Sequence, residues 1–262
     1  MTKLTLPVLL GALLSSGTAY AQSCGDILTV DTTLTADLTC AGPGLILDAD
    51  DIVLDCAGHV LNGDGTDIGI RLQGHTGVTI QNCVVNRFAS GIQLIDSSAN
   101  ALRTNSVSGS TSVGSGAIQL SSGSDGNVLL TNRTYQNDGR GFAIIDSTGN
   151  LMLKNGAYGN GFRGIDLIDA SGNALVQNHV ANNTSGGVVL SGSATANIVH
   201  DTQVSASGSE GFAVFSGVHY FSFNTSDNNG TWGINDFTGS WHLLDQCAGN
   251  GSGPSSPAGL CF

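Results

Sequence analysis

Residues 141–178 read GFAIIDSTGNLMLKNGAYGNGFRGIDLIDASGNALVQN, which is one pattern written almost twice. The pattern begins at Gly141 and again at Gly164, and each glycine precedes an apolar-x-apolar triplet. Asparagines follow nine and fourteen residues after each glycine. Alternation of this kind predicts a short strand with one buried face. The intervening Gly, Ser, Asn and Asp are residues typical of turns.

The same pattern extends over most of the chain in three columns that stay in phase. The glycines recur every 22 to 25 residues, at Gly69, Gly91, Gly116, Gly141, Gly164, Gly187, Gly211 and Gly233. One polar column contains Asn82, Asn105, Asn132, Asn155, Asn178, Thr202 and Asn224, and the other contains Asn100, Asn127, Asn150, Asn173 and Asn197. A single repeat cannot bury its apolar side, whereas stacked repeats can. The columns therefore predict an all-β solenoid, a parallel β-helix of about nine coils.

The register of the triplets predicts which side chains face inward. One inner stack should contain Ile92, Ile118, Phe142, Ile165, Val188 and Phe212. The asparagines should form ladders between coils and adopt the left-handed turn conformation that Asn tolerates. Their role is then structural and not catalytic.

The two ends of the chain differ from the repeat. Lys3, an apolar run and an Ala19-Tyr20-Ala21 cleavage site predict a signal peptide over residues 1–21. We expect an N-terminal cap over 22–43, the β-helix over 44–246 and a C-terminal tail or cap over 247–262.

Six cysteines in an exported chain predict disulfides, and the protein is expected to be secreted, either extracellular or periplasmic. Nearest-neighbour pairing would join Cys24–Cys40, Cys56–Cys83 and Cys247–Cys261. Six cysteines allow 15 connectivities, so the pairing and the oligomeric state stay open.

The charge narrows the possible partners. The chain has 8 Lys and Arg against 20 Asp and Glu, a formal net charge of −12, and cleavage would remove Lys3 as well. Nucleic-acid binding is not expected, because it depends on basic residues. An acidic polysaccharide would be repelled unless a cation intervened. No segment is long enough to predict a membrane span.

The chain resembles the right-handed parallel β-helix proteins of the pectate-lyase-like superfamily. The resemblance rests on Cys24-Gly25-Asp26, on the stretches 34–40 (LTADLTC) and 51–63 (DIVLDCAGHVLNG), on repeats such as 141–150, and on 255–261 (SSPAGLC). It covers nearly the whole mature chain and implies the fold. The superfamily includes polysaccharide lyases, hydrolases, esterases and epimerases as well as adhesins, so the resemblance alone does not imply one activity.

Candidate site residues lie on the outward column of the first sheet, where such solenoids commonly bind sugars, and in the turns on either side of it. Arg71, Gln93, Gln119 and Arg140 are candidates for substrate binding. Arg163 and Asp166 are candidates for catalysis, because a lyase or epimerase needs a base and a group that stabilises an enolate. Asp146 and Asp169, in equivalent turns, are candidate ligands for Ca²⁺. The competing interpretation is that these residues form weak ion pairs at the surface, worth about 0–1 kcal/mol each.

The sequence favours a secreted β-helix protein that interacts with a polysaccharide or cell-surface glycan, with lyase-like activity left open. The alternative is a non-catalytic adhesion or structural module. No contiguous catalytic motif decides whether the chain is an enzyme.

Overall fold

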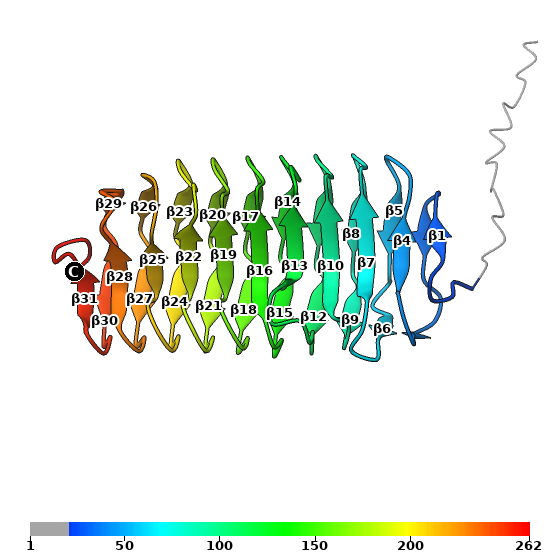
Figure 1. Cartoon of the computed structure of the whole chain (residues 1–262), viewed down its shortest axis with the longest axis horizontal. Coiled ribbons are helices and arrows are strands. Elements are labelled where there is room, and N and C mark those ends of the chain that lie inside the picture. The colour runs from blue at the N-terminus through cyan, green and yellow to red at the C-terminus, as the bar shows by residue number, and fades with distance from the viewer. Residues whose placement is uncertain (1–20) are drawn as a thin grey trace, which may run out of the picture.

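The computed structural model describes residues 21–262 as one long stack of β-strand coils. Figure 1 shows the coils following one another along a single axis, with the two ends of the chain at opposite ends of the stack. Each coil contributes one short strand to each of three parallel sheets, and the described residues contain no helix. Among those residues there is accordingly no helix of the length and apolar character needed to cross a membrane. The predicted signal peptide lies almost wholly outside the described residues.

The three sheets, here called A, B and C, run the length of the stack. Sheet A contains β1 (Ile27–Leu28), β4 (Leu45–Leu47), β7 (Ile68–Gln73), β10 (Ser90–Ile95), β13 (Gly116–Ser121), β16 (Arg140–Ile145), β19 (Ile165–Ile168), β22 (Val188–Ser191), β25 (Phe212–Val214), β28 (Trp232–Asp236) and β31 (Gly253–Ser256). Sheet B contains β2 (Thr32–Thr33), β5 (Val53–Asp55), β8 (Thr79–Gln81), β11 (Ala101–Arg103), β14 (Val128–Leu130), β17 (Leu151–Leu153), β20 (Ala174–Val176), β23 (Ile198–His200), β26 (Tyr220–Ser222) and β29 (Trp241–Leu243). Sheet C contains β3 (Leu38–Thr39), β6 (Val60–Asn62), β9 (Val84–Asn86), β12 (Ser106–Ser108), β15 (Arg133–Tyr135), β18 (Gly156–Tyr158), β21 (His179–Ala181), β24 (Gln203–Ser205), β27 (Thr225–Asp227) and β30 (Gln246–Ala248). The segment expected to be an N-terminal cap therefore itself contains strands β1 to β3, which adds a turn to the predicted nine.

The predicted register is confirmed. The inner stack of sheet A pairs Ile92 with Ile118, Ile118 with Phe142, and Phe142 with Ile165, and all four side chains are fully buried. The stack continues through Val188 and Phe212. This column forms one wall of a single apolar core that runs along the axis.

Asparagine ladders close the corners between sheets, as predicted. At the corner between sheets A and B, the Asn127 backbone N–H and its Nδ2 both donate to Asn150 Oδ1, at 2.8 and 3.1 Å. At the next corner, Asn132 makes the same two bonds to Asn155 Oδ1, at 2.9 and 3.1 Å. Each bond runs toward the following coil, so each side chain satisfies buried backbone donors that the turn leaves without partners.

The expected backbone conformation of the ladder asparagines is wrong. The residue immediately before each ladder position has the left-handed conformation, as at Thr131 (φ 55°) and Lys154 (φ 56°). The ladder residue itself immediately precedes the next strand and needs only to point inward. Asn82 is one of the left-handed residues (φ 55°), and Cys83 takes the ladder position that was predicted for it.

The sequence prediction missed a third ladder, at the corner between sheets C and A. Asn137, Asn160 and Asn183 lie five residues after Asn132, Asn155 and Asn178, and their side chains bond in series. The signal was present in the sequence, because the five-residue spacing that links the first two columns is simply repeated.

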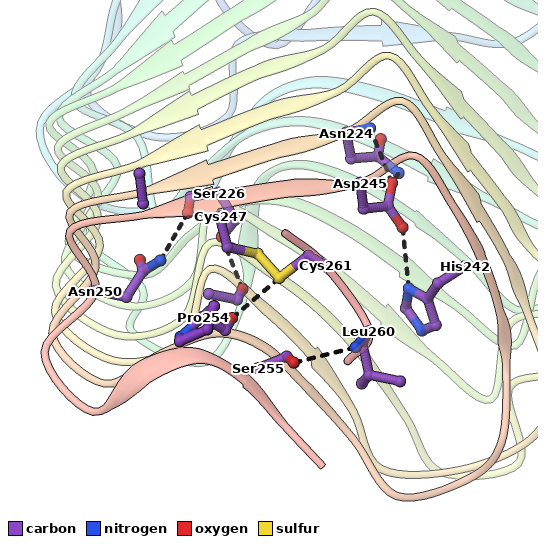
Figure 2. The surroundings of a disulfide bond; sticks show 12 residues. Asn224, Ser226, His242, Asp245, Cys247, Asn250, Pro254, Ser255, Leu260 and Cys261 are labelled. Carbon is purple, nitrogen blue, oxygen red and sulfur yellow. Dashed lines mark hydrogen bonds and ion pairs between the residues drawn. A yellow bond between two sulfur atoms is a disulfide. The ribbon is translucent and has the colours of Figure 1, made fainter. Parts of the chain in front are cut away.

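Three disulfides join the nearest-neighbour pairs Cys24–Cys40, Cys56–Cys83 and Cys247–Cys261, and no free cysteine lies in the described part of the chain. At the C-terminal end the last disulfide holds the tail against the final coil (Figure 2). There the Cys247 N–H donates to the Phe262 carbonyl at 3.0 Å, and the Phe262 N–H donates to the Asp245 carbonyl at 3.2 Å. The tail therefore pairs with the exposed edge of β30, the protection that an open sheet edge requires.

Replacing one ladder residue should destabilise the whole stack. Asn155→Ala removes the acceptor for both Asn132 donors and leaves the Leu129 carbonyl without its side-chain donor. We expect the free energy of unfolding in urea to fall by about 2–4 kcal/mol, because buried donors lose their partners. Asn62→Ala, on the outward side of β6, is the control and should change it by no more than about 0.5 kcal/mol. Equal effects of the two variants would contradict the ladder's role.

Candidate functional site

The outward face of sheet A has the predicted column of side chains in register. Arg71 pairs with Gln93, and Gln93 pairs with Gln119, on three successive strands. These three side chains are half-exposed, whereas the next four members of the column are buried. The buried members are Ala143, Asp166, Val189 and Ala213.

A shallow groove opens at the N-terminal part of this face. It has a volume of about 390 Å³ and is lined by Ile46, Leu47, Asp48, Arg71, Gln73, Gly74 and Asp96. Arg71 donates from Nη2 to Gln73 Oε1, which holds the guanidinium along the strand. The Nε of Arg71 has no acceptor among the described residues. The groove thus contains a cationic side chain whose hydrogen-bonding capacity the chain uses only in part.

Arg140, Arg163 and Asp166 meet in the middle of the face. Arg140 Nε donates to Asp166 Oδ2 at 2.5 Å, and Arg163 Nη1 donates to both carboxylate oxygens at 2.9 and 3.0 Å. The structure therefore brings the two predicted catalytic residues together with one of the predicted binding residues. The competing interpretation that these residues form ion pairs is confirmed, but its placement of the pairs at the surface is wrong, because the Asp166 side chain is 0% exposed.

The burial of Asp166 has an identifiable cause. Phe162 lies in the turn that precedes β19, the strand of Asp166. The guanidinium groups of Arg140 and Arg163 both lie over the Phe162 ring, at 5.2 and 4.9 Å from its centroid. Arg140 is also fixed by a bond from Nη1 to the Gly114 carbonyl at 2.6 Å. Asp166 is consequently an anchor for two cations, and it has neither the access nor the free lone pairs expected of a general base.

Sequence reasoning missed Phe162 and Glu210 as parts of this face. Glu210 is half-buried and accepts a bond from Asn235 Nδ2 at 3.3 Å. Burial alone would raise the pKa of Glu210, but bonds from Ser209 and Asn235 and the charge of Arg163 lower it below the ordinary value. Phe162 directly precedes Arg163, and its position between two arginines one coil apart was readable from the repeat.

The predicted calcium ligands occupy equivalent turns on successive coils. Asp146 and Asp169 both have left-handed backbones, with φ 47° and 53°. Asp169 Oδ1 accepts bonds from the Ser193 hydroxyl and N–H, both at 2.7 Å, and these bonds lower the pKa of Asp169. No group of three or more His, Cys, Asp or Glu arranged to hold a metal ion occurs in residues 21–262. The calcium site therefore remains a prediction, and it would need ligands besides this pair.

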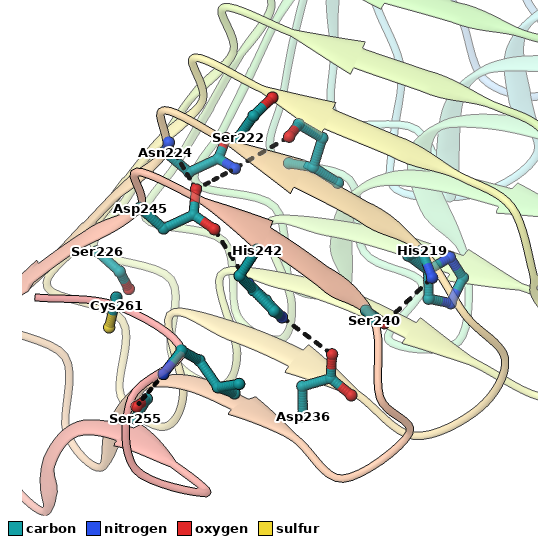
Figure 3. Close-up of polar contacts among 12 residues, drawn as sticks. His219, Ser222, Asn224, Ser226, Asp236, Ser240, His242, Asp245, Ser255 and Cys261 are labelled. Carbon is teal, nitrogen blue, oxygen red and sulfur yellow. Dashed lines mark hydrogen bonds and ion pairs between the residues drawn. The ribbon is translucent and has the colours of Figure 1, made fainter.

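A second cluster of titratable residues lies inside the last coil, and the sequence did not predict it. The His242 ring, 5% exposed, lies between two buried carboxylates, with Nδ1 3.0 Å from Asp245 Oδ2 and Nε2 3.1 Å from Asp236 Oδ2 (Figure 3). Phe221 stacks on the ring at a centroid distance of 4.8 Å. Both ring nitrogens can donate at once only when His242 is positively charged.

The charges in this cluster shift each other's pKa. Burial disfavours the imidazolium, but hydrogen bonds and charges from Asp236 and Asp245 outweigh it and raise the pKa of His242. Burial would raise the pKa of Asp236, whereas bonds from His242 and Thr238 lower it far below the ordinary value. Nearby His219 behaves differently, because burial lowers its pKa and its Nδ1 accepts from the Asn197 N–H at 3.2 Å.

Neutralising Asp166 should destabilise the fold. Asp166→Asn leaves two arginines facing a neutral amide in a buried position, so we expect the free energy of unfolding to fall by about 3–5 kcal/mol. The matched control is Asp169→Asn, an exposed carboxylate on the same coil, which should cost about 0–1 kcal/mol. Similar urea midpoints for the two variants would show that Asp166 is only a surface residue.

The His242 cluster should make stability depend on pH. The pKa of His242 is raised in the folded protein. Its charge therefore contributes fully to the free energy of unfolding below about pH 6.5, the ordinary pKa of His, and this contribution is lost as the pH rises through the higher folded-state pKa. The difference in urea stability between the native protein and His242→Gln should therefore shrink between about pH 6 and pH 9. His59→Gln, at a more exposed pair with Asp37, is the control. A difference that is constant or grows with pH would contradict the assignment of charge to His242.

Comparisons with known proteins agree with the architecture. Solved structures that are similar include a periplasmic alginate epimerase, AlgG, with 14% identity, TM-score 0.60 and coverage of 90% of this chain and 74% of that one. The A-module of the Azotobacter vinelandii mannuronan C-5 epimerase AlgE6 has 14% identity, TM-score 0.61 and coverage of 92% and 89%. The catalytic domain of a GH87 α-1,3-glucanase in complex with nigerose has 12% identity, TM-score 0.54 and coverage of 88% and 60%.

At these identities the solved structures show the fold alone. A search of curated proteins gives no significant match. The sequence model described as the right handed beta helix region matches residues 68–230, more than half of the chain. This protein belongs to the right-handed β-helix family.

Proposed function

We propose that the protein is an exported polysaccharide-binding β-helix and that the glycan lies along the outward face of sheet A. The observation that carries the proposal is the register-matched row Arg71, Gln93 and Gln119, which leads toward the Arg140–Arg163 pair. Successive members of such a row are about 4.8 Å apart, close to the length of one pyranose unit. A linear glycan parallel to the solenoid axis would meet a hydrogen-bonding side chain at each of these three coils.

The electrostatics of the face support an anionic or strongly polar glycan. Arg163 bonds to Asp166 through Nη1 only, so its other donors are available at the edge of the cluster. Arg140 and Arg163 are 15% and 22% exposed, and the buried carboxylate between them fixes their positions. Guanidinium groups held in place lose little conformational freedom when they bind carboxylate or hydroxyl oxygens. Arg140 and Arg163 face two carboxylates, Asp166 and Glu210, so this cluster is locally neutral although the whole chain has a net charge of −12.

The similar solved structures favour a carbohydrate partner, and the disulfides favour export. The similar solved structures are named as alginate and mannuronan epimerases and an α-1,3-glucanase. Disulfides at both ends of the chain fit an oxidising compartment, such as the periplasm or the exterior of the cell.

Binding without proton abstraction fits the geometry better than lyase chemistry. A lyase or epimerase step requires a base that reaches the substrate, and Asp166 is fully buried and bonded to two arginines. We therefore assign Arg163 to glycan contact and Asp166 to positioning it. The candidate catalytic role of the pair stays a prediction.

Removing one donor from the row should weaken glycan binding. Arg71→Gln should reduce retention in affinity electrophoresis with alginate or polygalacturonate by about tenfold in apparent affinity, the equivalent of about 1.4 kcal/mol for one charged hydrogen bond. A neutral α-glucan run in parallel tests whether the partner is acidic. Because Arg71 lies at the surface, its loss should leave the melting temperature unchanged.

Arg103→Gln is the matched control, since it removes the same charge from the exposed face of sheet B. Its retention should equal that of the native protein. Failure of the native protein to be retained by any of these glycans, or equal losses in both variants, would overturn the proposal. Unsaturated products released from the polyuronates would instead establish lyase activity.

A further inference from the structure

Outside sheet A, an aromatic and cationic cluster is built on the outward face of sheet C, across β15, β18 and β21. Arg133, Gly156 and His179 are aligned in register on these three strands. The middle position has no side chain, and the Tyr158 ring occupies the space above it. A Cβ added at Gly156 would lie 2.3 Å from Tyr158 Cε2. Glycine is therefore required for the ring to lie across the strand between the two neighbouring coils.

The ring fixes the groups on either side of it. The Arg133 guanidinium carbon lies 4.9 Å from the centroid of Tyr158 and 5.1 Å from that of Tyr135. On the other side, the His179 ring is 5.3 Å from Tyr158, and His179 Nδ1 is 3.1 Å from the Tyr158 hydroxyl oxygen. When the hydroxyl donates to Nδ1, the proton of neutral His179 resides on Nε2. His179 then presents a hydrogen-bond donor at either protonation state.

A groove begins at His179 and crosses the corner between sheets B and C. It is lined by Lys154, Gln177, Asn178, His179, Asp201 and Gln203. Asp201 is the one carboxylate in this lining, and it already accepts a bond from Gln177 Nε2 at 2.9 Å. Lys154 has no ion-pair partner among the described residues. The groove thus presents an unpaired ammonium and an oriented imidazole to the solvent.

We propose that this groove binds the oxyanion group of an acidic sugar, with Lys154 and His179 as its direct contacts. Tyr158 and Gly156 position His179, and Arg133 adds positive charge one side chain away. An anionic partner fits these contacts, because Lys154 and Arg133 attract an anion and repel a metal cation. An isolated small oxyanion group fits better than a nucleic acid, because the chain as a whole has a net charge of −12. The site lies on sheet C, so it is separate from the glycan face proposed on sheet A.

The test is an NMR titration that follows the imidazole resonances of His179 in the full chain at constant ionic strength. The probes are sodium glucuronate, sodium sulfate and glucose. We expect a saturable shift with glucuronate or sulfate and none with glucose. Stronger binding of glucuronate identifies a uronate carboxylate as the ligand group, and stronger binding of sulfate identifies a sulfate ester. Because the signal is local to His179, the outcome does not depend on whether sheet A binds glycan.

Substitutions at Lys154, Gly156 and Tyr158 distinguish the effect of charge on anion binding from the effect of the position of His179. Lys154→Gln should weaken the anion response about tenfold by removing a charged donor. Gly156→Ala should weaken it similarly without changing any charge, because the added Cβ displaces Tyr158. Tyr158→Phe retains the ring and removes only the hydroxyl, so it tests the same contact if Gly156→Ala does not fold.

Arg103→Gln is the charge control and should titrate like the native protein. Equal shifts with glucose and glucuronate, no saturable shift with either anion, or a full response in Lys154→Gln would each overturn the proposal.

Discussion

The structure depends on hydrogen bonds between side chains at its corners. A coil of three strands must turn three times, and each turn leaves backbone donors pointing along the axis inside the stack. An asparagine placed just after each left-handed residue accepts those donors from the previous coil with Oδ1 and donates onward with Nδ2. The apolar core supplies most of the burial, but these amides determine where each coil turns and keep adjacent coils in register.

The sequence predicted the fold well because the signals that determine it are local and repeated. The glycine, the triplet and two asparagine columns recur with one spacing, so the inward stack from Ile92 to Phe212 and the pairing of the strands could be predicted without the structure. The third ladder had the same kind of signal and was simply overlooked. The conformation of the asparagines could not be deduced from propensity, because Asn tolerates the left-handed region whether or not it uses it; here the preceding residue adopts it.

The candidate site was predictable only in part. The repeat correctly placed Arg140, Arg163 and Asp166 near one another. It could not show that Phe162 and the preceding turns cover the carboxylate, because the path of a turn over a sheet depends on packing between coils. The same limit applies to His242, whose carboxylate partners lie three and six residues away in the sequence on different sides of the coil. In both places a buried charge is tolerated because every carboxylate oxygen, and each nitrogen of the His242 ring, has a specific partner.

The hydrogen bonds between ladder asparagines all run in the same direction along the stack. In a ladder, the backbone N–H and the Nδ2 of one asparagine both donate to the Oδ1 of the next asparagine toward the C-terminus, so the last member receives two hydrogen bonds and has no following ladder residue to which it can donate. Asp245 meets this condition in the second ladder, because its carboxylate accepts both bonds from Asn224 and its side chain has no N–H that would need a further acceptor. The first ladder differs, because His219 Nδ1 accepts from the Asn197 N–H and the His219 N–H donates onward to Ser240 Oγ at 3.1 Å. Whole coils can therefore be added inside such a stack without breaking a ladder, whereas a coil appended after Asp245 would find no side-chain amide at that corner to donate to it.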